Sequence, residues 1–447
     1  MSVEGGLRVA INAQLEPEGG SGGVVTVLRA LAALAGLDGP EEYVFVGPHD
    51  SQEWLRSILP PGQTVVPGPG PARRSVDRME PFKRALGPLR PAARGLRRVL
   101  GATVQAAESG GAGLASLKSF SPPTPKNFYE GLGCDVVHFP FQSYEPCRLP
   151  TVYNPHDLQH LHYPEFFTPA EIGLRENLHP SACRAAHTVV AASEFVKRDV
   201  VERYRLDSRK VQVIPWAPPP LPGSPTADIS ALRRKYGLSD EPFALYPAMT
   251  WEHKNHVRLL EALARLRDRE GLEIRFVFTG HQTDFWPRVS LRVNELGLGG
   301  QVKFLGLVPR EELSAFYRAA QFVFVPTLFE AASAPLFEAW QHGAPAACSS
   351  VTSLPEQAAG AALLFDPFDV GQIARALAHM ATEEDLREEL RRRGTRRLDD
   401  FSLERTAKAY RAVYRRAAGL MLCDEDRRLL GRDWMRSGAS GERPDVK

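Results

Sequence analysis

The feature that most constrains the fold is an alternation of short β-branched segments with longer helical patterns, repeated along most of the chain. Strands that alternate with helices in this way are typical of βαβ units, in which helices cover both faces of a mainly parallel sheet. A chain of 447 residues is also too long for one compact core. We therefore expect an α/β protein with two doubly wound domains.

A Pro-rich segment divides the pattern into two series. The sequence PWAPPPLPGSP at 215–225 cannot sustain a helix or a strand and is typical of an interdomain linker. We place the first domain at 1–215, the linker at 216–225 and the second domain at 226–400. The strands that we expect lie at 7–12, 136–140, 151–155, 188–193 and 211–215 in the first series and at 243–249, 274–280, 302–308, 322–327 and 362–367 in the second.

Three segments stand outside these series. The insert at 67–125 is rich in Pro, Gly, Ala and Arg, and its middle part is strongly basic. Such charge runs are ordinarily solvated, and the alternative is a surface helix that rests on anionic lipid. Residues 401–422 are expected to form a C-terminal helix that crosses back to the first domain. The charged tail at 423–447 is expected to be frayed.

Charge and cysteine content limit the possible partners and location. With 55 basic and 53 acidic residues the formal charge is +2, so no chain-wide field attracts nucleic acid. The five cysteines are scattered without metal-type spacing, which predicts reduced thiols. The N-terminal sequence lacks the features of a signal peptide, and no apolar stretch reaches the roughly 18 residues of a membrane span. We expect a cytoplasmic protein, at most peripheral at the inner face of the cell membrane.

The first candidate binding residues follow an expected strand. In open parallel sheets ligands bind at the carboxyl ends of the strands, and two facing domains form a cleft there. The strand at 243–249 is followed by TWEHKNH and then by an amphipathic helical pattern, which places Lys254 and Asn255 at a helix N-terminus. Free N–H groups and the helix dipole favour an anion there. The alternative is a solvated lysine beside an Asn N-cap.

A second candidate lies in FVPTLFEAASAPLFEAWQHGAP at 324–345. Pro335 suits the first turn of a helix, so we expect Ser333 or Ala334 to cap a helix that begins there. Together with Ala332, these small residues let the backbone approach a ligand closely. Glu330 precedes this turn at the strand end, and Glu338, a few residues further on, projects from the first turn of the helix.

Two carboxylates on either side of an amide-rich turn suit a particular ligand. A carboxylate can accept hydrogen bonds from two vicinal hydroxyls, and backbone amides can bind phosphate. Glu330 and Glu338 therefore fit a molecule with hydroxyls at both ends and phosphate in between, as in a sugar nucleotide. The alternative is a surface acid and a helix acid that complements the dipole.

Seven segments of the chain, which include the two described above, resemble in content and order the motifs of the family four retaining glycosyltransferases. These enzymes have the GT-B fold, in which two Rossmann-like domains face a central cleft. The resemblance covers nearly the whole chain apart from the basic insert and the tail. The two glutamates match the E-x7-E element of that family. The sequences that carry the resemblance are EGGSGGVVTVLRAL, YNPHDLQHLHYPEFF, VVAASEFVKRDVVERY, VQVIPW, YPAMTWEHKNHVRLLEAL, VKFLGLVPREELSAFYRAA and EAASAPLFEAWQHGAPAACSSVTSLPEQAAGAALLFDP.

The resemblance implies roles for individual residues. It assigns His156 and Asp157 to a position beside the reacting sugar, Lys254 to the diphosphate and Glu330 to the transferred sugar. Glu338 matches the residue that binds the ribose hydroxyls. The remaining residues implied or expected to contact the nucleotide sugar are Gly22, Gly23, Asn255, Leu307, Val308, Ala332, Ser333 and Ala334.

The sequence departs from the family pattern at two places. Met249 stands where the family usually has an Arg, five residues before the diphosphate lysine. Ala331, Ala332 and Ser333 replace the Gly-Phe-Gly that many members have after the first glutamate. The first change removes a charge that would help the leaving group, and the second alters the loop that faces the sugar.

The resemblance implies a retaining, metal-independent hexosyltransferase with a nucleotide-diphosphate sugar as donor, GDP-mannose or a UDP-sugar, and a glycan or lipid-linked acceptor. The resemblance implies a fold without an Asp-x-Asp metal site, so Lys254, helix N-termini and loop amides are expected to stabilise the leaving group, and no cofactor is expected. A metal cluster of His156, His160 and His162 is the alternative use of HDLQHLHY. For the whole chain the alternatives are an inactive nucleotide-sugar-binding subunit and a sugar-nucleotide epimerase.

Overall fold

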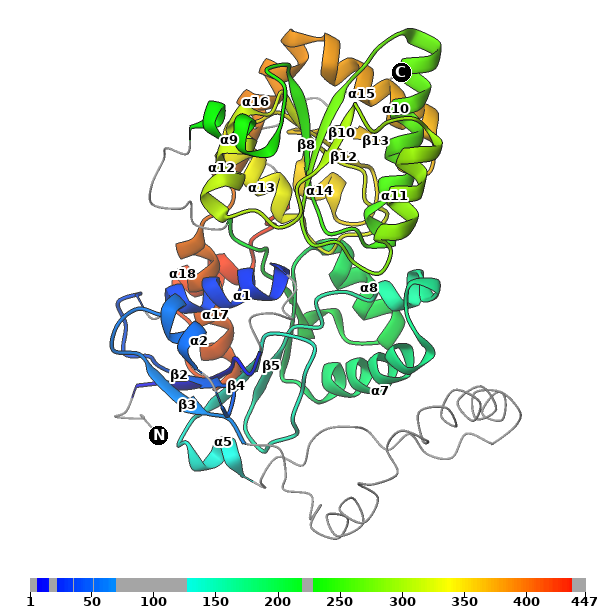
Figure 1. Ribbon diagram of the computed structural model, residues 1–447. Helices are drawn as coiled ribbons and strands as arrows, with labels where there is room; N and C mark the ends of the chain where they lie inside the picture. The colour runs from blue at the N-terminus through cyan, green and yellow to red at the C-terminus, as the bar shows by residue number, and fades with distance from the viewer. Residues whose placement is uncertain are drawn as a thin grey trace, which may run out of the picture.

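The computed structural model describes residues 6–15, 22–34, 36–50, 52–69, 127–218 and 228–435. These residues form two α/β domains, with the N-terminal domain in the lower half of Figure 1 and the C-terminal domain in the upper half. From residue 70 onward the basic insert expected at 67–125 lies outside the described residues, as do residues 219–225 of the linker.

The N-terminal domain is built on a seven-stranded parallel sheet in the order β3-β2-β1-β4-β5-β6-β7. Its central strands are rich in Val, Ile and Phe and buried on both faces, as expected for a sheet covered by helices on two sides. The strands are β1 Arg8–Asn12, β2 Glu42–Gly47, β3 Thr64–Pro67, β4 Val136–Phe139, β5 Thr151–Tyr153, β6 Thr188–Ala191 and β7 Val211–Val213.

The C-terminal domain contains a six-stranded parallel sheet in the order β10-β9-β8-β11-β12-β13. Phe276, Phe278, Phe322 and Phe324 pack in its core, where aromatic side chains contribute much of the buried apolar area. The strands are β8 Phe243–Pro247, β9 Arg275–Thr279, β10 Val302–Phe304, β11 Phe322–Val325, β12 Ala346–Ser349 and β13 Leu363–Phe365.

Helices connect successive strands and lie on both faces of each sheet. The helices of the N-terminal domain are α1 Gly22–Leu34, α2 Glu53–Ile58, α5 Phe128–Gly131, α6 Gln159–His162, α7 Pro169–Ala185 and α8 Glu194–Tyr204, with the 3-10 helices η3 Pro164–Phe166 and η4 Ser208–Lys210. Those of the C-terminal domain are α9 Ile229–Tyr236, η5 Glu252–Lys254, α10 His256–Glu270, α11 Trp286–Glu295, α12 Arg310–Ala319, α13 Ala334–Gln341, α14 Leu354–Ala358, α15 Val370–Thr382 and α16 Glu384–Leu398.

In both sheets the strand order reverses direction beside the first strand of the domain. β1 lies between β2 and β4, and β8 lies between β9 and β11. Such reversals are where open parallel sheets form ligand-binding crevices, because the loops after the two strands diverge. The loops after β8 and β11 carry Lys254 and Glu330, so both residues lie at the reversal of the second sheet.

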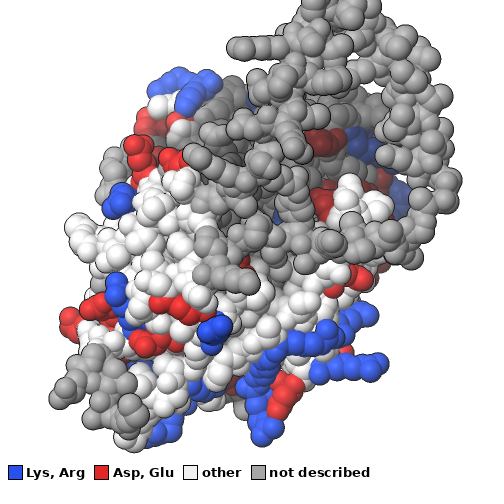
Figure 2. All heavy atoms as spheres, turned by 90° about the horizontal axis from the view of Figure 1, so that it is seen from below, with Lys and Arg blue, Asp and Glu red and all other residues white. Residues whose placement is uncertain are grey.

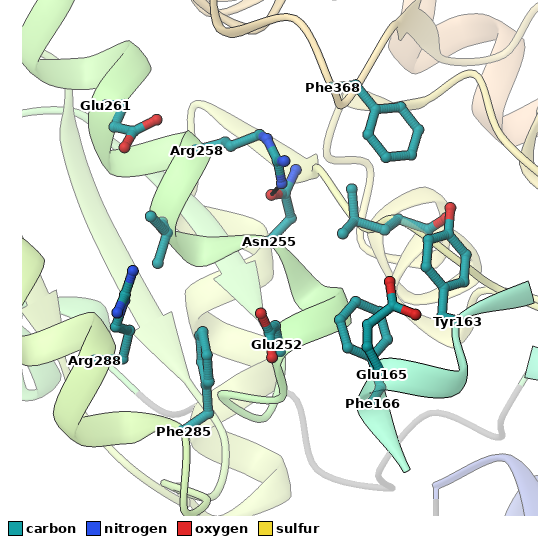
Figure 3. A pocket seen from close by; sticks show the side chains of 12 residues that line it. Tyr163, Glu165, Phe166, Glu252, Asn255, Arg258, Glu261, Phe285, Arg288 and Phe368 are labelled. Atoms are coloured by element: carbon teal, nitrogen blue, oxygen red, sulfur yellow. Dashed lines mark hydrogen bonds between the residues drawn. The ribbon is translucent and has the colours of Figure 1, made fainter. Parts of the chain in front are cut away.

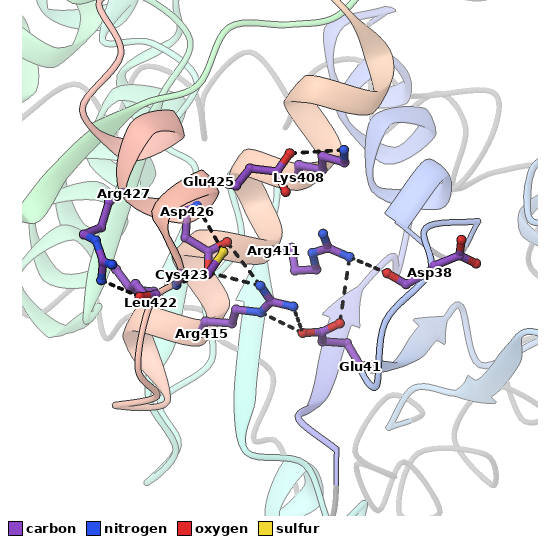
Figure 4. A network of polar contacts seen from close by, with 10 residues as sticks. All are labelled: Asp38, Glu41, Lys408, Arg411, Arg415, Leu422, Cys423, Glu425, Asp426 and Arg427. Carbon is purple, nitrogen blue, oxygen red and sulfur yellow. Dashed lines mark hydrogen bonds and ion pairs between the residues drawn. The ribbon is translucent and has the colours of Figure 1, made fainter.

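The chain returns to the N-terminal domain through α17 (Leu403–Ala417) and α18 (Asp424–Leu430), which lie beside α1 in Figure 1. Tyr410, Val413 and Tyr414 of α17 share one core cluster with Ile11 and Leu28. A polar network of side chains from α17, α18 and Glu41, which directly precedes β2, stabilises the same contact (Figure 4). A C-terminal helix expected at 401–422 is thus found against the first domain.

The tail differs from the expectation of a frayed segment over its first part. Residues 424–430 form α18, whose first turn is capped by the Cys423 and Asp426 side chains. Trp434 and Met435 are buried in the core cluster that contains α17. The apolar residues between the charges in this segment cover the outer side of α17, which is why it is ordered. Residues 436–447 lie outside the described part of the chain.

The molecular surface seen from below the N-terminal domain shows Lys and Arg side chains beside Asp and Glu side chains among the described residues (Figure 2). This mixture agrees with the small formal charge of +2. Within the described ranges, no helix has the length and apolar character needed to cross a membrane. All five cysteines are unpaired thiols.

Candidate functional site

An ion pair joins the two loops at the reversal of the C-terminal sheet. Lys254, at the end of η5, donates from Nζ to Oε1 of Glu330 over 2.5 Å. Their side chains are only 20% and 14% exposed. Because β8 and β11 are adjacent strands, the loops that follow them meet at the edge of the sheet. The structure thus brings together a cation and a carboxylate, separated by 76 residues in sequence.

Both ends of the turn after Glu330 are held by the loop that follows β12 and by α14. The Glu330 N–H donates to the Thr352 hydroxyl (3.1 Å), and the Ser353 hydroxyl donates to the Glu330 carbonyl (2.8 Å). Gln357 accepts from the Ser333 N–H (2.7 Å) and donates to the Ser333 carbonyl (2.8 Å). These bonds fix the turn without using the Glu330 carboxylate, which is left to face Lys254.

Helix α13 begins where the sequence indicated. Ser333 is its N-cap residue, Ala334 is the first helical residue and Pro335 lies in the first turn. The Ser333 hydroxyl makes no capping hydrogen bond, and its buried Oγ has no partner among the described residues. Ala332 is buried, and Ala331 packs into a core cluster of the N-terminal domain. The turn therefore touches both domains.

Glu338 lies in the second turn of α13 and not in the first turn, as the sequence suggested, because the helix begins at Ala334. Its Oε2 accepts a hydrogen bond from the Tyr317 hydroxyl over 2.6 Å. Burial raises the pKa of this carboxyl, while the Tyr317 hydroxyl and the charges of Arg310 and Arg29 act in the opposite direction. Arg29 belongs to α1, so a cation of the N-terminal domain lies within electrostatic reach of Glu338 across the cleft.

His156 adopts a left-handed backbone with φ of 65°, which is uncommon for a residue with a side chain. Its Nε2 donates to the Pro140 carbonyl over 2.8 Å, so the ring is held between β4 and the loop after β5. Burial lowers the pKa of His156, which favours the neutral imidazole. The ring packs edge-on against Trp216, at the start of the expected linker. Strained backbone of this kind concentrates at functional sites.

The other expected site residues fall at several places around the cleft. The Asp157 carboxylate accepts from the Gln159 N–H and so shapes the turn after His156. Helix α1 begins at Gly22 and includes Gly23. Leu307 and Val308 lie in the loop between β10 and α12, with Leu307 strongly exposed.

The Asn255 side chain links three loops of the C-terminal domain. Its side-chain amide donates to the carbonyls of Pro326 and Pro367, each over 2.9 Å. These two bonds tie the start of α10 to the loops after β11 and β13. Its backbone is left-handed, with φ of 61°, and its side chain does not cap α10. The Asn255 amide is therefore hydrogen-bonded to these two loops and makes no hydrogen bond with Lys254.

The remaining histidines of HDLQHLHY do not converge with His156. His160 is buried, which lowers its pKa to about 4, and it packs against His179 and Phe167. His162 donates from Nε2 to the Asp199 carboxylate over 2.8 Å and packs against Phe329 of the C-terminal domain. In the described part of the chain no three His, Cys, Asp or Glu side chains are grouped as metal ligands.

Several residues of this site carried no individual signal in the sequence. Glu338 interacts with Arg29 and Tyr317, and Ser333 interacts with Gln357. In each case the two residues are far apart in sequence. Thr352 and Ser353 lie in the stretch SSVTSLPEQ, which belongs to the last of the motifs quoted above. The hydroxyl groups of this stretch were the available signal, but only the fold shows which backbone they hold.

Comparisons of the sequence with known families agree with this geometry. Residues 228–397 match the family described as glycosyl transferases group 1, and residues 111–217 match the one described as glycosyltransferase family 4. The O-antigen chain mannosyltransferase B of Escherichia coli is 27% identical over 290 residues, covering 62% of this chain and 75% of that protein. A D-inositol 3-phosphate glycosyltransferase of Corynebacterium jeikeium is 28% identical over 240 residues, covering 51% and 57%.

A shorter match covers a serotype-specific mannosyltransferase WbdA of Escherichia coli. It is 30% identical over 184 residues, which is 40% of this chain and 22% of the relative. This chain therefore spans about a fifth of the length of that protein. The match shows similarity of one region and carries no statement about the whole relative.

Solved structures show the same architecture. The sucrose-phosphate synthase of Thermosynechococcus elongatus superposes with a TM-score of 0.62 at 17% identity, covering 92% of this chain and 98% of that one. HepE of Anabaena, solved with UDP and glucose, gives a TM-score of 0.61 at 15% identity, covering 91% and 99%. At such identities the likeness shows the fold. Taken with the sequence matches and the paired glutamates, it means that the chain belongs to the family four, group 1 type of glycosyltransferases and has their GT-B fold.

Proposed function

We propose that this glycosyltransferase moves a hexosyl unit, with retention of configuration, from a nucleotide-diphosphate sugar to a glycan or lipid-linked acceptor. GDP-mannose and UDP-sugars are the candidate donors. The observation that carries the proposal is the pairing of Lys254 with Glu330 at the sheet reversal, with Glu338 further along the same turn and helix. A diphosphate at Lys254 would lie between the two carboxylates, which suit the hydroxyls of the two sugar rings.

The chemistry of the reaction needs a cation at this place. Breaking the bond between the sugar and the diphosphate leaves negative charge on the departing nucleotide, which a preorganised cation and helix N-termini stabilise. Lys254 lies next to the N-terminus of α10, and Ser333 is the residue that precedes the first turn of α13. Relatives named as mannosyltransferases support a mannosyl donor, and a similar structure with UDP and glucose supports a nucleotide-sugar site.

A donor panel tests the proposal. UDP-, GDP- and dTDP-sugars are each incubated with the protein, and their hydrolysis and the thermal stabilisation that they cause are measured. A ligand at a hundredfold excess over its Kd stabilises the native state by about 2.7 kcal/mol, so the right donor will stand out. Failure of every nucleotide sugar to stabilise or react would contradict the proposal.

We expect the reaction to continue when divalent ions are removed. Lys254 and the helix N-termini are proposed to do the work of a metal ion at the diphosphate, so chelation removes nothing essential. Donor turnover should therefore be unchanged, within about twofold, after dialysis against EDTA. Turnover that disappears with EDTA and returns with Mg²⁺ or Mn²⁺ would refute metal independence.

Donor binding should weaken in mildly acidic solution. Burial raises the pKa of Glu338 above the 4.5 of a free side chain, so this carboxylate becomes protonated at a higher pH than an exposed Glu. A protonated carboxyl can no longer accept two hydroxyl hydrogen bonds, and the donor KM should rise as the pH falls through that raised value.

The substitution Glu338→Gln provides the control for this effect. It should raise the donor KM by about tenfold near neutral pH, the scale of one charge-assisted hydrogen bond, and should flatten the acidic rise. The measurement is KM against pH for both proteins. An equal acidic rise in the variant would assign it to another group.

One observation favours a second candidate function, a nucleotide-sugar-binding subunit without activity. Met249 supplies no charge where the family usually has an Arg. Such a subunit would be stabilised by a donor in the panel but would neither hydrolyse it nor transfer its sugar. Arg29 and Arg310, which lie near Glu338, provide cations at the cleft that Met249 does not.

A further inference from the structure

A pocket of about 660 Å³ lies between the two domains and is not used by the proposed reaction. Figure 3 shows Tyr163, Glu165 and Phe166 of the N-terminal domain on one side, facing Asn255, which precedes α10, and Arg258 of that helix. The lining also includes Glu252, Glu261, Arg288, Leu328 and Phe368. Its volume falls in the range of small-molecule sites.

The pocket is separate from the site around Lys254. Lys254, Glu330 and Glu338 do not line it. Helices α10 and α13 belong to different strand connections, α10 following β8 and α13 following β11. Helix α10 packs on α15, whereas α13 packs on α12 and α16. Asn255, which lines the pocket, ties the start of α10 to the loops after β11 and β13 through its bonds to the carbonyls of Pro326 and Pro367.

Aromatic rings on both walls give the pocket flat apolar surfaces. The rings of Tyr163 and Phe166 stack with centroids 5.2 Å apart and an angle of 8°. On the other wall Phe368 is 48% exposed, with the Arg258 guanidinium 5.8 Å from its ring centroid. The electron-rich face of such a ring attracts the polarised C–H groups on the flat face of a pyranose. Exposed rings at a polar site therefore suit sugar better than peptide backbone.

The polar side chains of the pocket suit hydroxyl groups. Among the described residues, the carboxylates of Glu165 and Glu252 and the guanidinium of Arg288 have no hydrogen-bonded or ionic partner. A hydroxyl can donate to the first two and accept from the third. Glu261 is already paired with Arg292 over 2.8 Å. The lining therefore has no excess of positive charge with which to hold a diphosphate.

We propose that this pocket binds a neutral oligosaccharide, with one pyranose ring against Phe368 and its hydroxyls on Glu165, Glu252 and Arg288. The inference rests on the proposed function in one respect: the bound glycan is taken to be the part of the acceptor that is remote from its growing end. Because the walls come from both domains, a bound glycan bridges them. Tyr163 already donates a hydrogen bond to the Leu328 carbonyl across this boundary over 3.3 Å.

Saturation-transfer NMR without any donor tests the inference. The probes are methyl α-mannoside, α-linked mannotriose and maltotriose, added to the full-length protein. We expect binding of at least one trisaccharide, weakened about tenfold by Phe368→Ala and by Glu165→Ala, the scale for loss of one anchoring side chain. Leu291→Ala, which removes an equally exposed apolar side chain from α11, should leave binding unchanged.

The outcomes separate this inference from the proposed function. Binding that survives in both pocket variants would place the glycan elsewhere, such as the cleft at Glu330, and would overturn the inference. If none of the three probes received saturation from the protein, the inference would also be overturned. Binding that is lost in the pocket variants supports the inference even if the donor panel fails, because no nucleotide sugar enters this experiment.

Discussion

Replacing Lys254 by Ala is expected to lower turnover by roughly 100- to 1000-fold, the scale for loss of one preorganised electrostatic group at a developing negative charge. Lys254 is the cation that pairs with Glu330 at the reversal of the C-terminal sheet, and it is mostly shielded from water. Shielding keeps its interaction with a diphosphate strong. The measurement is kcat with the donor identified by the panel, under saturating donor and acceptor.

A matched lysine elsewhere in the same domain controls for general effects of lost charge. Lys235 pairs with Glu312 over 2.7 Å, but its side chain is 53% exposed and it lies on α9. Lys235→Ala should leave kcat within about twofold, since exposed ion pairs contribute little. Near-normal turnover in Lys254→Ala would refute the role of this residue.

The variant Lys254→Ala also leaves Glu330 without its partner, so stability must be followed separately. Unfolding of Lys254→Ala and of the double variant Lys254→Ala with Glu330→Gln, followed by circular dichroism, shows whether the lost pair loosens the turn. A loss of turnover in a protein that melts like the wild type assigns the effect to chemistry.

The sequence predicted the α/β class because parallel strands have a strong local signal, whereas the strand order and its reversal points come from the structure. Runs such as FALYP and FVFV are apolar throughout, which is typical of strands buried on both faces. β12, with the sequence AACS, was not predicted, because Ala and Ser have low strand propensity and only pairing with β11 and β13 makes it a strand. β3 is short and ends in Pro67, so its local signal was equally weak. β2 was also not named, although EYVFVG has clear strand character.

The candidate site was predictable where a residue follows a strand and unpredictable where it acts through a distant partner. Lys254 and Glu330 follow β8 and β11, so the sequence placed both at one edge of a sheet. Their 2.5 Å contact depends on the pairing of those strands. Arg29 approaches Glu338 only because the two domains face each other. Local patterns carry no information about such domain arrangements.

The C-terminal segment shows the same limit. The charges of 423–435 suggested a frayed tail, but Trp434 is buried and α18 packs on α17. The energetics of that packing depend on the network in Figure 4. Arg415 donates from Nε to Glu41 over 2.7 Å and from Nη1 to Asp426 over 3.1 Å, and Arg411 donates to the Asp38 carbonyl over 2.8 Å.

Replacing Glu41 by Ala should destabilise the N-terminal domain by about 3–5 kcal/mol, the scale for breaking a buried ion pair. The Glu41 side chain is only 4% exposed, so its loss leaves the guanidinium of Arg415 partly uncompensated inside the contact between β2 and α17. The free energy of unfolding is measured in urea. The control Glu404→Ala removes an exposed partner of Lys408 on α17 and should cost about 0.5 kcal/mol or less. Equal losses in the two variants would mean that the Glu41 network does not hold α17 in place, and that its apolar contacts with α1 suffice.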